Sequence, residues 1–312
     1  MRKFLLHILL PTVATLLLLT AAAEGLLRLS SNERLYKSRY MKHHAAELQT
    51  LVLGSSNTNR AIIPSRLGQG RAFSSAGSAQ DLCNDEWILE KYIGVMDSLR
   101  YVFLDLNYAS LLSDIGHGDE YATLRPQYRV YWGNPRYEVS WTDWLEVSRF
   151  NWLAKRKEIV DRDTIHPDGF MSRAQPPYDD NDWQYYGWQT ALDHTRIDNP
   201  DAASLYRDNM ARLRNIADHC RQHGTTVVLV TCPVHEYFRK HLNERQVNLM
   251  RRAADSLCSE YANVRRIDFL DSTLFSAEEM NNANHLNLLG AIRFSNMIAD
   301  SLSHWEALEK RL

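Results

Sequence analysis

The chain of 312 residues has few cysteines, no strong excess of charge and no polybasic run. Its four cysteines are scattered without a CxxC pair, which excludes the ligand spacing of a structural zinc site. The formal net charge of −2 gives no support for a nucleic-acid partner. Internal repeats and low-complexity tracts are absent as well. What remains is the composition of a globular body, in which we predict the cysteines to be small buried hydrophobes.

A long apolar run opens the chain. It extends from Phe4 to Ala23 and follows two basic residues, Arg2 and Lys3. Its length is that of a helix that crosses a bilayer. The basic residues favour the cytoplasmic side for the N-terminus, which predicts an extracytoplasmic body.

The same run also predicts the domain limits. The three alanines at 21–23 resemble a signal-peptidase site, so residues 1–24 are a signal-anchor or a signal peptide. With the anchor retained, the protein is a single-pass protein of the cytoplasmic membrane with a periplasmic body; with the leader cleaved, it is secreted. Residues 25–48 are expected to be a charged juxtamembrane spacer, and residues 49–312 the folded domain.

Apolar runs of strand length alternate with amphipathic stretches of helix length through most of this domain. Strands are predicted over 50–54, 71–75, 101–106, 225–231 and 264–269, and helices over 81–99, 201–223, 243–262 and 288–302. Helices of this length between strands are typical of βαβ units. We therefore predict a three-layer α/β/α fold with a mostly parallel sheet of about five strands.

An aromatic-rich insertion, about 110–198, interrupts this alternation. Its tryptophans are Trp132, Trp141, Trp144, Trp152, Trp183 and Trp188. Such side chains can stack on sugar rings or line an acyl pocket, or they can form a small core of the insertion itself. The sequence leaves these alternatives open.

Polar residues follow the first three predicted strands where each one ends. Gly54-Ser55-Ser56 follows the first strand, Gly77 the second and Asn107 the third. In a parallel sheet these turns meet at one edge, where ligands bind. A second motif, His285-Leu286-Asn287, comes just before the last predicted helix. A serine on a tight strand-to-helix turn and a distant histidine are the pair that nucleophilic acyl transfer needs.

This ordered set of motifs resembles the SGNH (GDSL-like) hydrolase superfamily. The Leu-Gly-Ser-Ser motif near the start of the chain and the His-Leu-Asn-x-x-Gly-Ala motif near its end resemble those of one group within the superfamily. This group consists of membrane-anchored extracytoplasmic members related to cell-envelope O-acyltransferase and D-alanyl-transfer accessory proteins. The resemblance covers about 50–110 and 200–303 and does not extend to the insertion. It implies a flavodoxin-like strand order.

The resemblance also implies roles for individual residues. Ser56 is the nucleophile and His285 the general base, and Asn282 holds the position of the residue that orients the histidine. The N–H groups of Ser56 and Gly77, with the amide of Asn107, form the oxyanion hole.

Two departures from the superfamily pattern leave alternatives open. An aspartate is usual at the position of Asn282, so Asp271 or Glu279 is an alternative partner for the histidine. The third motif lacks its usual glycine, which makes Asp105 an alternative to Asn107. Ser55 is the rival nucleophile.

His235 follows the fourth predicted strand, and Asp105 lies at the end of the third. We expect both to be candidates for substrate contact at the same edge of the sheet.

These expectations combine into an extracytoplasmic serine esterase or O-acyltransferase. It acts through a Ser-His acyl-enzyme on acyl groups of a cell-envelope glycan, or on another ester, and needs no metal or organic cofactor. The alternative is a non-catalytic binding or scaffold protein of the same fold that partners a multipass acyl-exporting membrane protein. Asn282 is the feature that favours this alternative.

Overall fold

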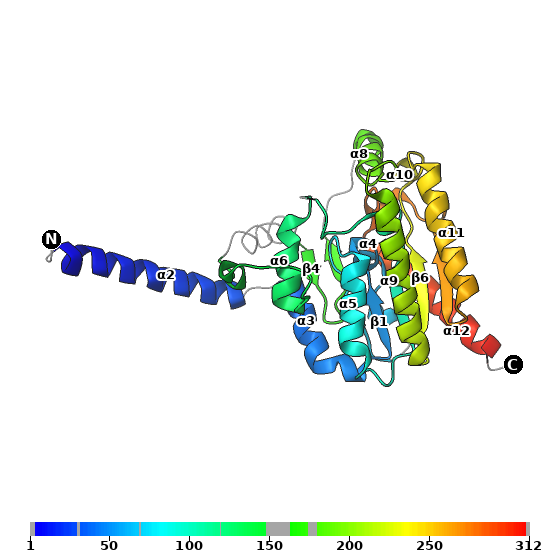
Figure 1. Ribbon diagram of the computed structural model, residues 1–312. Coiled ribbons are helices and arrows are strands. Elements are labelled where there is room, and N and C mark those ends of the chain that lie inside the picture. The colour runs from blue at the N-terminus through cyan, green and yellow to red at the C-terminus, as the bar shows by residue number, and fades with distance from the viewer. Residues whose placement is uncertain are drawn as a thin grey trace.

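The computed structural model describes residues 4–29, 32–68, 70–118, 120–147, 163–173 and 180–309. A parallel five-stranded sheet lies at its centre (Figure 1). Its strands are β1 (Thr50–Leu53), β2 (Ala72–Ser74), β3 (Tyr101–Asp105), β6 (Thr226–Thr231) and β7 (Val264–Asp268). They lie in the order β2-β1-β3-β6-β7, and every neighbouring pair is parallel. This is the flavodoxin-like order, whose switch point lies between β1 and β3.

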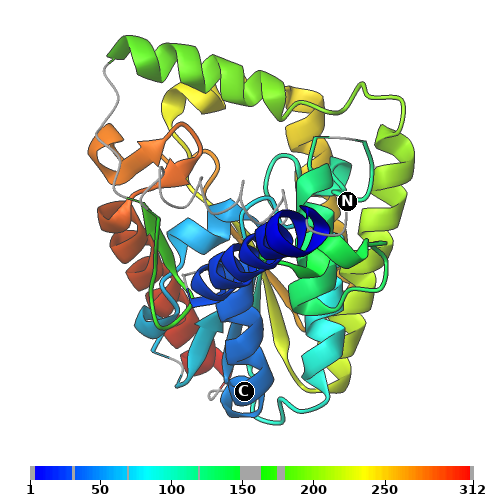
Figure 2. The same cartoon turned by 90° about the vertical axis from the view of Figure 1, so that its left-hand side faces the viewer.

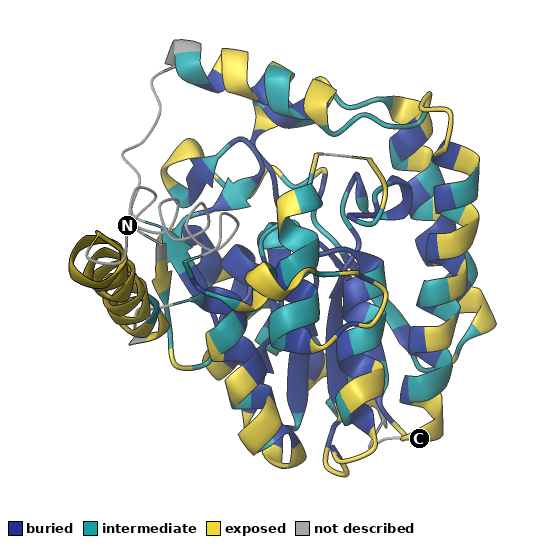
Figure 3. Ribbon diagram, turned by 60° about the vertical axis from the view of Figure 1, so that its left-hand side comes forward, coloured by how far each residue is buried: buried dark blue, intermediate teal, exposed yellow. Residues whose placement is uncertain are grey.

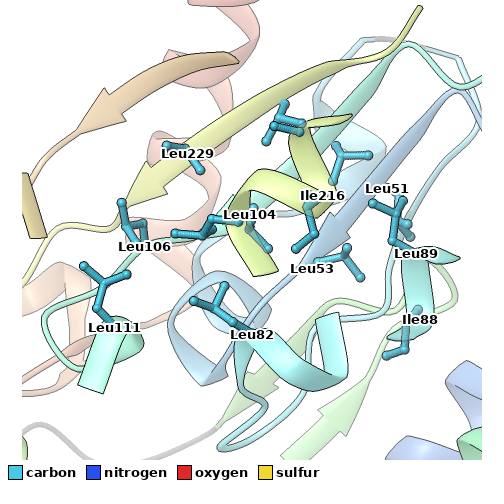
Figure 4. Packing of buried hydrophobic residues seen from close by; sticks show 14 of the residues in the cluster. Leu51, Leu53, Leu82, Ile88, Leu89, Leu104, Leu106, Leu111, Ile216 and Leu229 are labelled. Carbon is cyan, nitrogen blue, oxygen red and sulfur yellow. The ribbon is translucent and has the colours of Figure 1, made fainter. Parts of the chain in front are cut away.

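Helices cover both faces of the sheet, which confirms the three-layer fold. Alternate strand residues point to opposite faces, so Leu51 and Leu53 join one core and Val52 the other. The first core packs against α5 (Leu82–Ile93), α9 (Ala202–Gln222) and α11 (Glu244–Glu260). Figure 4 shows Ile216 among the leucines of this core. The second core packs against α4 (Ser56–Ala61) and α12 (Leu288–Glu309).

Two helices end at other residues than the predicted ones. Helix α5 begins after Asp81, whose carboxylate accepts the N–H of Asn84, and it ends at Ile93 and not at Leu99. Helix α12 continues to Glu309, beyond the predicted end at Leu302.

All four cysteines are free thiols. Cys220 and Cys232 are buried, as predicted, while Cys83 and Cys258 are half-buried.

Part of the predicted spacer is packed into the body. Helix α3 (Glu33–His44) and the turn η2 (Ala45–Glu47) precede β1, and Met41 and Ala45 belong to the first core. Lys37 on α3 is fully buried and pairs with Glu33 at 3.0 Å. Its ammonium also donates to the side chain of Asn59 on α4 at 2.7 Å and to the carbonyl of Ala76 after β2. The ion pair therefore joins the segment nearest the apolar helix to α4 and to the turn after β2.

The N-terminal segment forms one long helix, η1 (Leu5–Leu9) continued by α2 (Leu10–Leu29). Residues Leu5–Arg28 are long and apolar enough to cross a membrane, a test that signal sequences pass as well. The helix stands away from the body and is exposed along nearly all its length (Figures 1 and 3).

The described part of the insertion contains short elements and one longer helix. They are η4 (Ser110–Leu112), η5 (Ala122–Leu124), α6 (Arg125–Gln127), η6 (Tyr128–Trp132), η7 (Trp141–Trp144), a hairpin of β4 (Asp163–Ile165) and β5 (Met171–Arg173), and α8 (Asp180–Asp193). Tyr128 and Trp132 belong to the first core and Trp183 to the second. The insertion therefore shares the cores of the sheet. Trp152 lies outside the described residues.

The remaining elements are short, and the hairpin that contains His285 lies at the carboxyl edge of the sheet. They are η3 (Pro64–Arg66), α10 (Glu236–Arg239), η8 (Ala277–Glu279) and a hairpin of β8 (Met280–Asn282) and β9 (His285–Leu286). Helix α8 contacts α10 and lies across this end of the molecule (Figure 2).

Candidate active site

Ser56 and His285 meet at the carboxyl edge of the sheet, although 229 residues separate them. Ser56 is the first residue of α4, directly after the turn that follows β1. His285 begins β9. The distance from Ser56 Oγ to His285 Nε2 is 2.7 Å, a hydrogen bond. Both side chains are half-buried, so the pair is accessible from solvent.

Asn282 accepts a hydrogen bond from the other nitrogen of the same imidazole. The two residues face each other across the tight hairpin of β8 and β9, and Asn282 Oδ1 lies 2.8 Å from His285 Nδ1. The backbone N–H of Asn284 also donates to this oxygen at 3.2 Å. Because a backbone N–H can only donate, the atom facing it is the amide oxygen. Nδ1 therefore carries the proton, and Nε2 is left to accept from Ser56.

The two alternative carboxylates have partners elsewhere. Asp271 pairs with Arg251 at 2.5 Å. Glu279 pairs with Arg293 at 3.0 Å and accepts the N–H of Ser276 in a capping box. The histidine is thus oriented by the neutral Asn282.

Ser55, the rival nucleophile, is part of a different hydrogen-bond group. Its hydroxyl bonds Asp105, and its backbone N–H donates to the same carboxylate at 3.2 Å. Asn107 donates to Asp105 at 2.8 Å and to Ser55 Oγ at 3.2 Å. Ser55 also caps α4 through the N–H of Asn57. Burial raises the pKa of Asp105, while its bonds to Ser55 and Asn107 oppose that shift.

A second buried carboxylate, Asp85 on α5, supports the turn that carries both serines. It accepts the N–H of Gly54 at 2.8 Å and the side-chain amide of Gln80 at 2.6 Å. Burial raises the pKa of Asp85 well above its usual range.

Only glycine fits at position 54. Its φ is +117°, and an added Cβ would lie 2.2 Å from the Cβ of Asp105. The end of β3 therefore approaches this turn too closely for a side chain at position 54, and the turn leads directly to Ser56 at the start of α4.

The N–H of Gly77, predicted to be part of the oxyanion hole, has a backbone partner in this structure. It donates to the carbonyl of Gly54 at 2.9 Å and so joins the two turns. The N–H of Ser56 lies in the first turn of α4, where helices leave their N–H groups without an intrahelical partner.

A cavity of about 130 Å³ opens next to Ser56. Most of the residues that line it are of polar type, among them Ser55, Gln80, Asp85, Asp105 and Asn107. Two side chains of the insertion, Tyr121 and His194, also line it, as do Leu82 and Ile115. Burial lowers the pKa of His194, which favours its neutral form.

His235 does not line this cavity. Its ring stacks on Trp183, with 4.1 Å between ring centroids, and its Nδ1 accepts the N–H of Tyr237 at the start of α10. Burial lowers its pKa. In this structure His235 packs the insertion onto the body and caps a helix.

Several residues of the site carry no signal in the sequence. Asp85 and Gln80 lie in or beside a helix whose pattern indicates only burial, and His194 lies just after α8. Within the described ranges, no group of three or more His, Cys, Asp or Glu side chains is placed to hold a metal ion.

Comparisons with known proteins add a structural neighbour. No family model matches the chain, and no curated protein matches it. Among solved structures, the chain is similar to a GDSL-like lipase from Bacteroides thetaiotaomicron, with 8% sequence identity and a TM-score of 0.41. The match covers 90% of this chain and 100% of that one.

Proposed function

We propose that this protein is a membrane-tethered, extracytoplasmic serine esterase or O-acyltransferase of the SGNH type, with Ser56 as nucleophile and His285 as general base. The observation that carries the proposal is the hydrogen-bonded series Ser56–His285–Asn282, with 2.7 Å and 2.8 Å between the bonding atoms. It has the contacts of a catalytic triad, with an amide in the third place.

The proton arrangement supports this assignment. Because Nδ1–H donates to Asn282, Nε2 can take the proton of the Ser56 hydroxyl as the oxygen attacks an ester carbonyl. The ester bond then breaks, the imidazolium returns the proton to the leaving alkoxide, and an acyl-enzyme remains. Water or a sugar hydroxyl accepts the acyl group in the second half of the reaction.

The charge that forms on the carbonyl oxygen needs hydrogen-bond donors. The backbone N–H of Ser56 is one donor, and the partial positive charge at the start of α4 acts in the same direction. The side-chain amide of Asn107 donates to Asp105 at 2.8 Å and to Ser55 Oγ at 3.2 Å. It becomes a second donor to the oxyanion when the longer bond, to Ser55, breaks. Gly77 contributes differently, because its N–H holds the Gly54 carbonyl.

The cavity favours a short acyl group. An apolar cavity of about 150 Å³ holds one benzene ring, and the cavity beside Ser56 is of similar size, about 130 Å³. An acetyl group or a similarly small acyl group fits this volume, while a long alkyl chain would have to extend out of it. We propose an acylated cell-envelope glycan as the substrate, in keeping with the extracytoplasmic location proposed for the body.

A fluorophosphonate probe tests the proposal on the purified full-length protein. We expect the wild type to be labelled, Ser56→Ala to lose the label and His285→Ala to be labelled more slowly. Ser55→Ala is the matched control, with the neighbouring hydroxyl removed, and it should keep the label.

Labelling that is lost in Ser55→Ala and kept in Ser56→Ala would show that Ser55, and not Ser56, is the nucleophile. No labelling of a folded wild-type protein would leave the non-catalytic binding or scaffold function, which the neutral Asn282 favours.

A further inference from the structure

Two exposed tryptophans lie next to the end of the apolar helix that meets the body. Trp141 and Trp144 are the first and last residues of η7 and are 78% and 51% exposed. Neither lines the cavity beside Ser56. In Figure 1 this turn is the short dark green helix beside the inner end of α2. Exposed tryptophans are costly in water unless a partner covers them.

Direct bonds hold η7 at the end of α2. Arg28 Nη2 donates to the carbonyl of Trp144 at 3.2 Å. Glu24 accepts the backbone N–H of Val147 at 3.0 Å and pairs with Arg28 at 2.7 Å. These are the first charged side chains after the apolar run, so they mark the depth at which the helix leaves the hydrocarbon. The backbone of Trp144 is bonded at that depth.

The same turn is bonded to the body on its other side. Glu146 accepts a hydrogen bond from Tyr131 at 2.9 Å, and the Tyr131 hydroxyl accepts one from Asn32 at 3.1 Å. Asn32 is the N-cap of α3. A capping box between Ser140 and Asp143 closes η7 itself. The tryptophans thus extend from a braced turn between the apolar helix and the folded domain.

We propose that Trp141 and Trp144 insert into the headgroup layer of the membrane that α2 spans and hold the body against its extracytoplasmic surface. Tryptophan suits this layer because its ring is apolar and its indole N–H needs a polar partner. The inference rests on the proposed membrane anchor and is independent of the proposed chemistry. Helix α2 runs across the direction of the strands (Figure 1), so the carboxyl edge of the sheet would face along the membrane.

The test uses the full-length protein in phosphatidylcholine vesicles whose acyl chains carry bromine at carbons 6 and 7. Bromine quenches indole fluorescence only at short range. We expect the wild type to float with the vesicles and to lose part of its tryptophan emission. Trp141→Phe/Trp144→Phe should float equally well and lose at least half of that quenching.

Trp188→Phe is the matched control, because Trp188 is similarly exposed, at 46%, on α8. It should leave the quenching unchanged. The inference is overturned if the wild type floats without being quenched, or if the double variant is quenched as strongly as the wild type. Neither result contradicts the proposed membrane anchor. The inference is also overturned if the emission of Trp141 and Trp144 responds to soluble acylated glycan and not to brominated lipid. That result would indicate that the two rings stack on sugars. Protein that fails to float refutes the anchor together with this inference.

Discussion

Replacing Asn282 by aspartate is the most direct perturbation of the proposed mechanism. The new carboxylate keeps the geometry, because its oxygen accepts the same two N–H groups, from His285 at 2.8 Å and from Asn284 at 3.2 Å. It adds a negative charge beside the imidazolium that forms during attack. Two unit charges 4 Å apart interact by about 4 kcal/mol at an effective dielectric constant of 20.

The gain is smaller than this because the pair is half-buried and the carboxylate loses hydration. Taking half of the Coulomb energy, about 2 kcal/mol, we expect Asn282→Asp to raise kcat about 30-fold. The gain stays well below the factor of about 10⁴ seen where an amide selects the wrong tautomer. Here the Asn284 N–H already orients the amide oxygen toward Nδ1.

The assay is hydrolysis of p-nitrophenyl acetate by the purified full-length protein across a pH series. The added charge favours the protonated imidazole, so the acidic limb of the Asn282→Asp profile should lie at higher pH than that of the wild type. Asn282→Ala should lower kcat, because Nδ1–H loses its acceptor. Adding Ser56→Ala to Asn282→Asp should abolish the gain. A folded Asn282→Asp protein with unchanged or lower kcat at its optimal pH would refute this account of Asn282.

Two further predictions concern buried charges. Lys37→Met leaves Glu33 charged and buried without the ammonium group that pairs with it, so the free energy of unfolding should fall by about 3–5 kcal/mol. Urea denaturation measures this loss, and the double variant Lys37→Met/Glu33→Gln should recover much of it. A loss below about 1 kcal/mol contradicts the prediction. Asp85 has a raised pKa in the folded state, so its stabilising contribution is complete below the unfolded-state pKa and is lost as pH rises through the folded-state pKa. Asp85→Asn should therefore become more stable relative to wild type as pH rises, and a difference in unfolding free energy that is constant with pH would count against it.

The sheet could be predicted because its signals are local. The run Thr225–Thr231 is apolar and β-branched over nearly its full length, and β6 is buried over all but its first residue. The helix signals are equally local, and Asn243 caps α11 through its own side chain. Where a boundary depends on a cap or on later packing, as in α5 and α12, the predicted limits shift by several residues.

The residues at the centre of the candidate site could be predicted from the sequence, but the contacts that hold the surrounding residues could not. Gly54 and Ser56 follow a strand, and His285 precedes a helix, so their meeting follows from the parallel topology. The bond from Gly77 to Gly54 and the packing of His235 on Trp183 depend on how two turns and an insertion come together. Strand and turn signals contain no information on those contacts.

By itself, the sequence determined the apolar N-terminal helix, the three-layer fold and the order of the serine, glycine, amide and histidine around one edge of the sheet. These depend on periodicity and on residues close together in the chain. Only the tertiary structure decided which atom of Asn282 faces the histidine, that Asp85 supports the serine turn, and that Lys37 is buried against α4 and the turn after β2. Each of these rests on directional bonds, most of them between distant segments, whose partners and desolvation are set only when the segments pack.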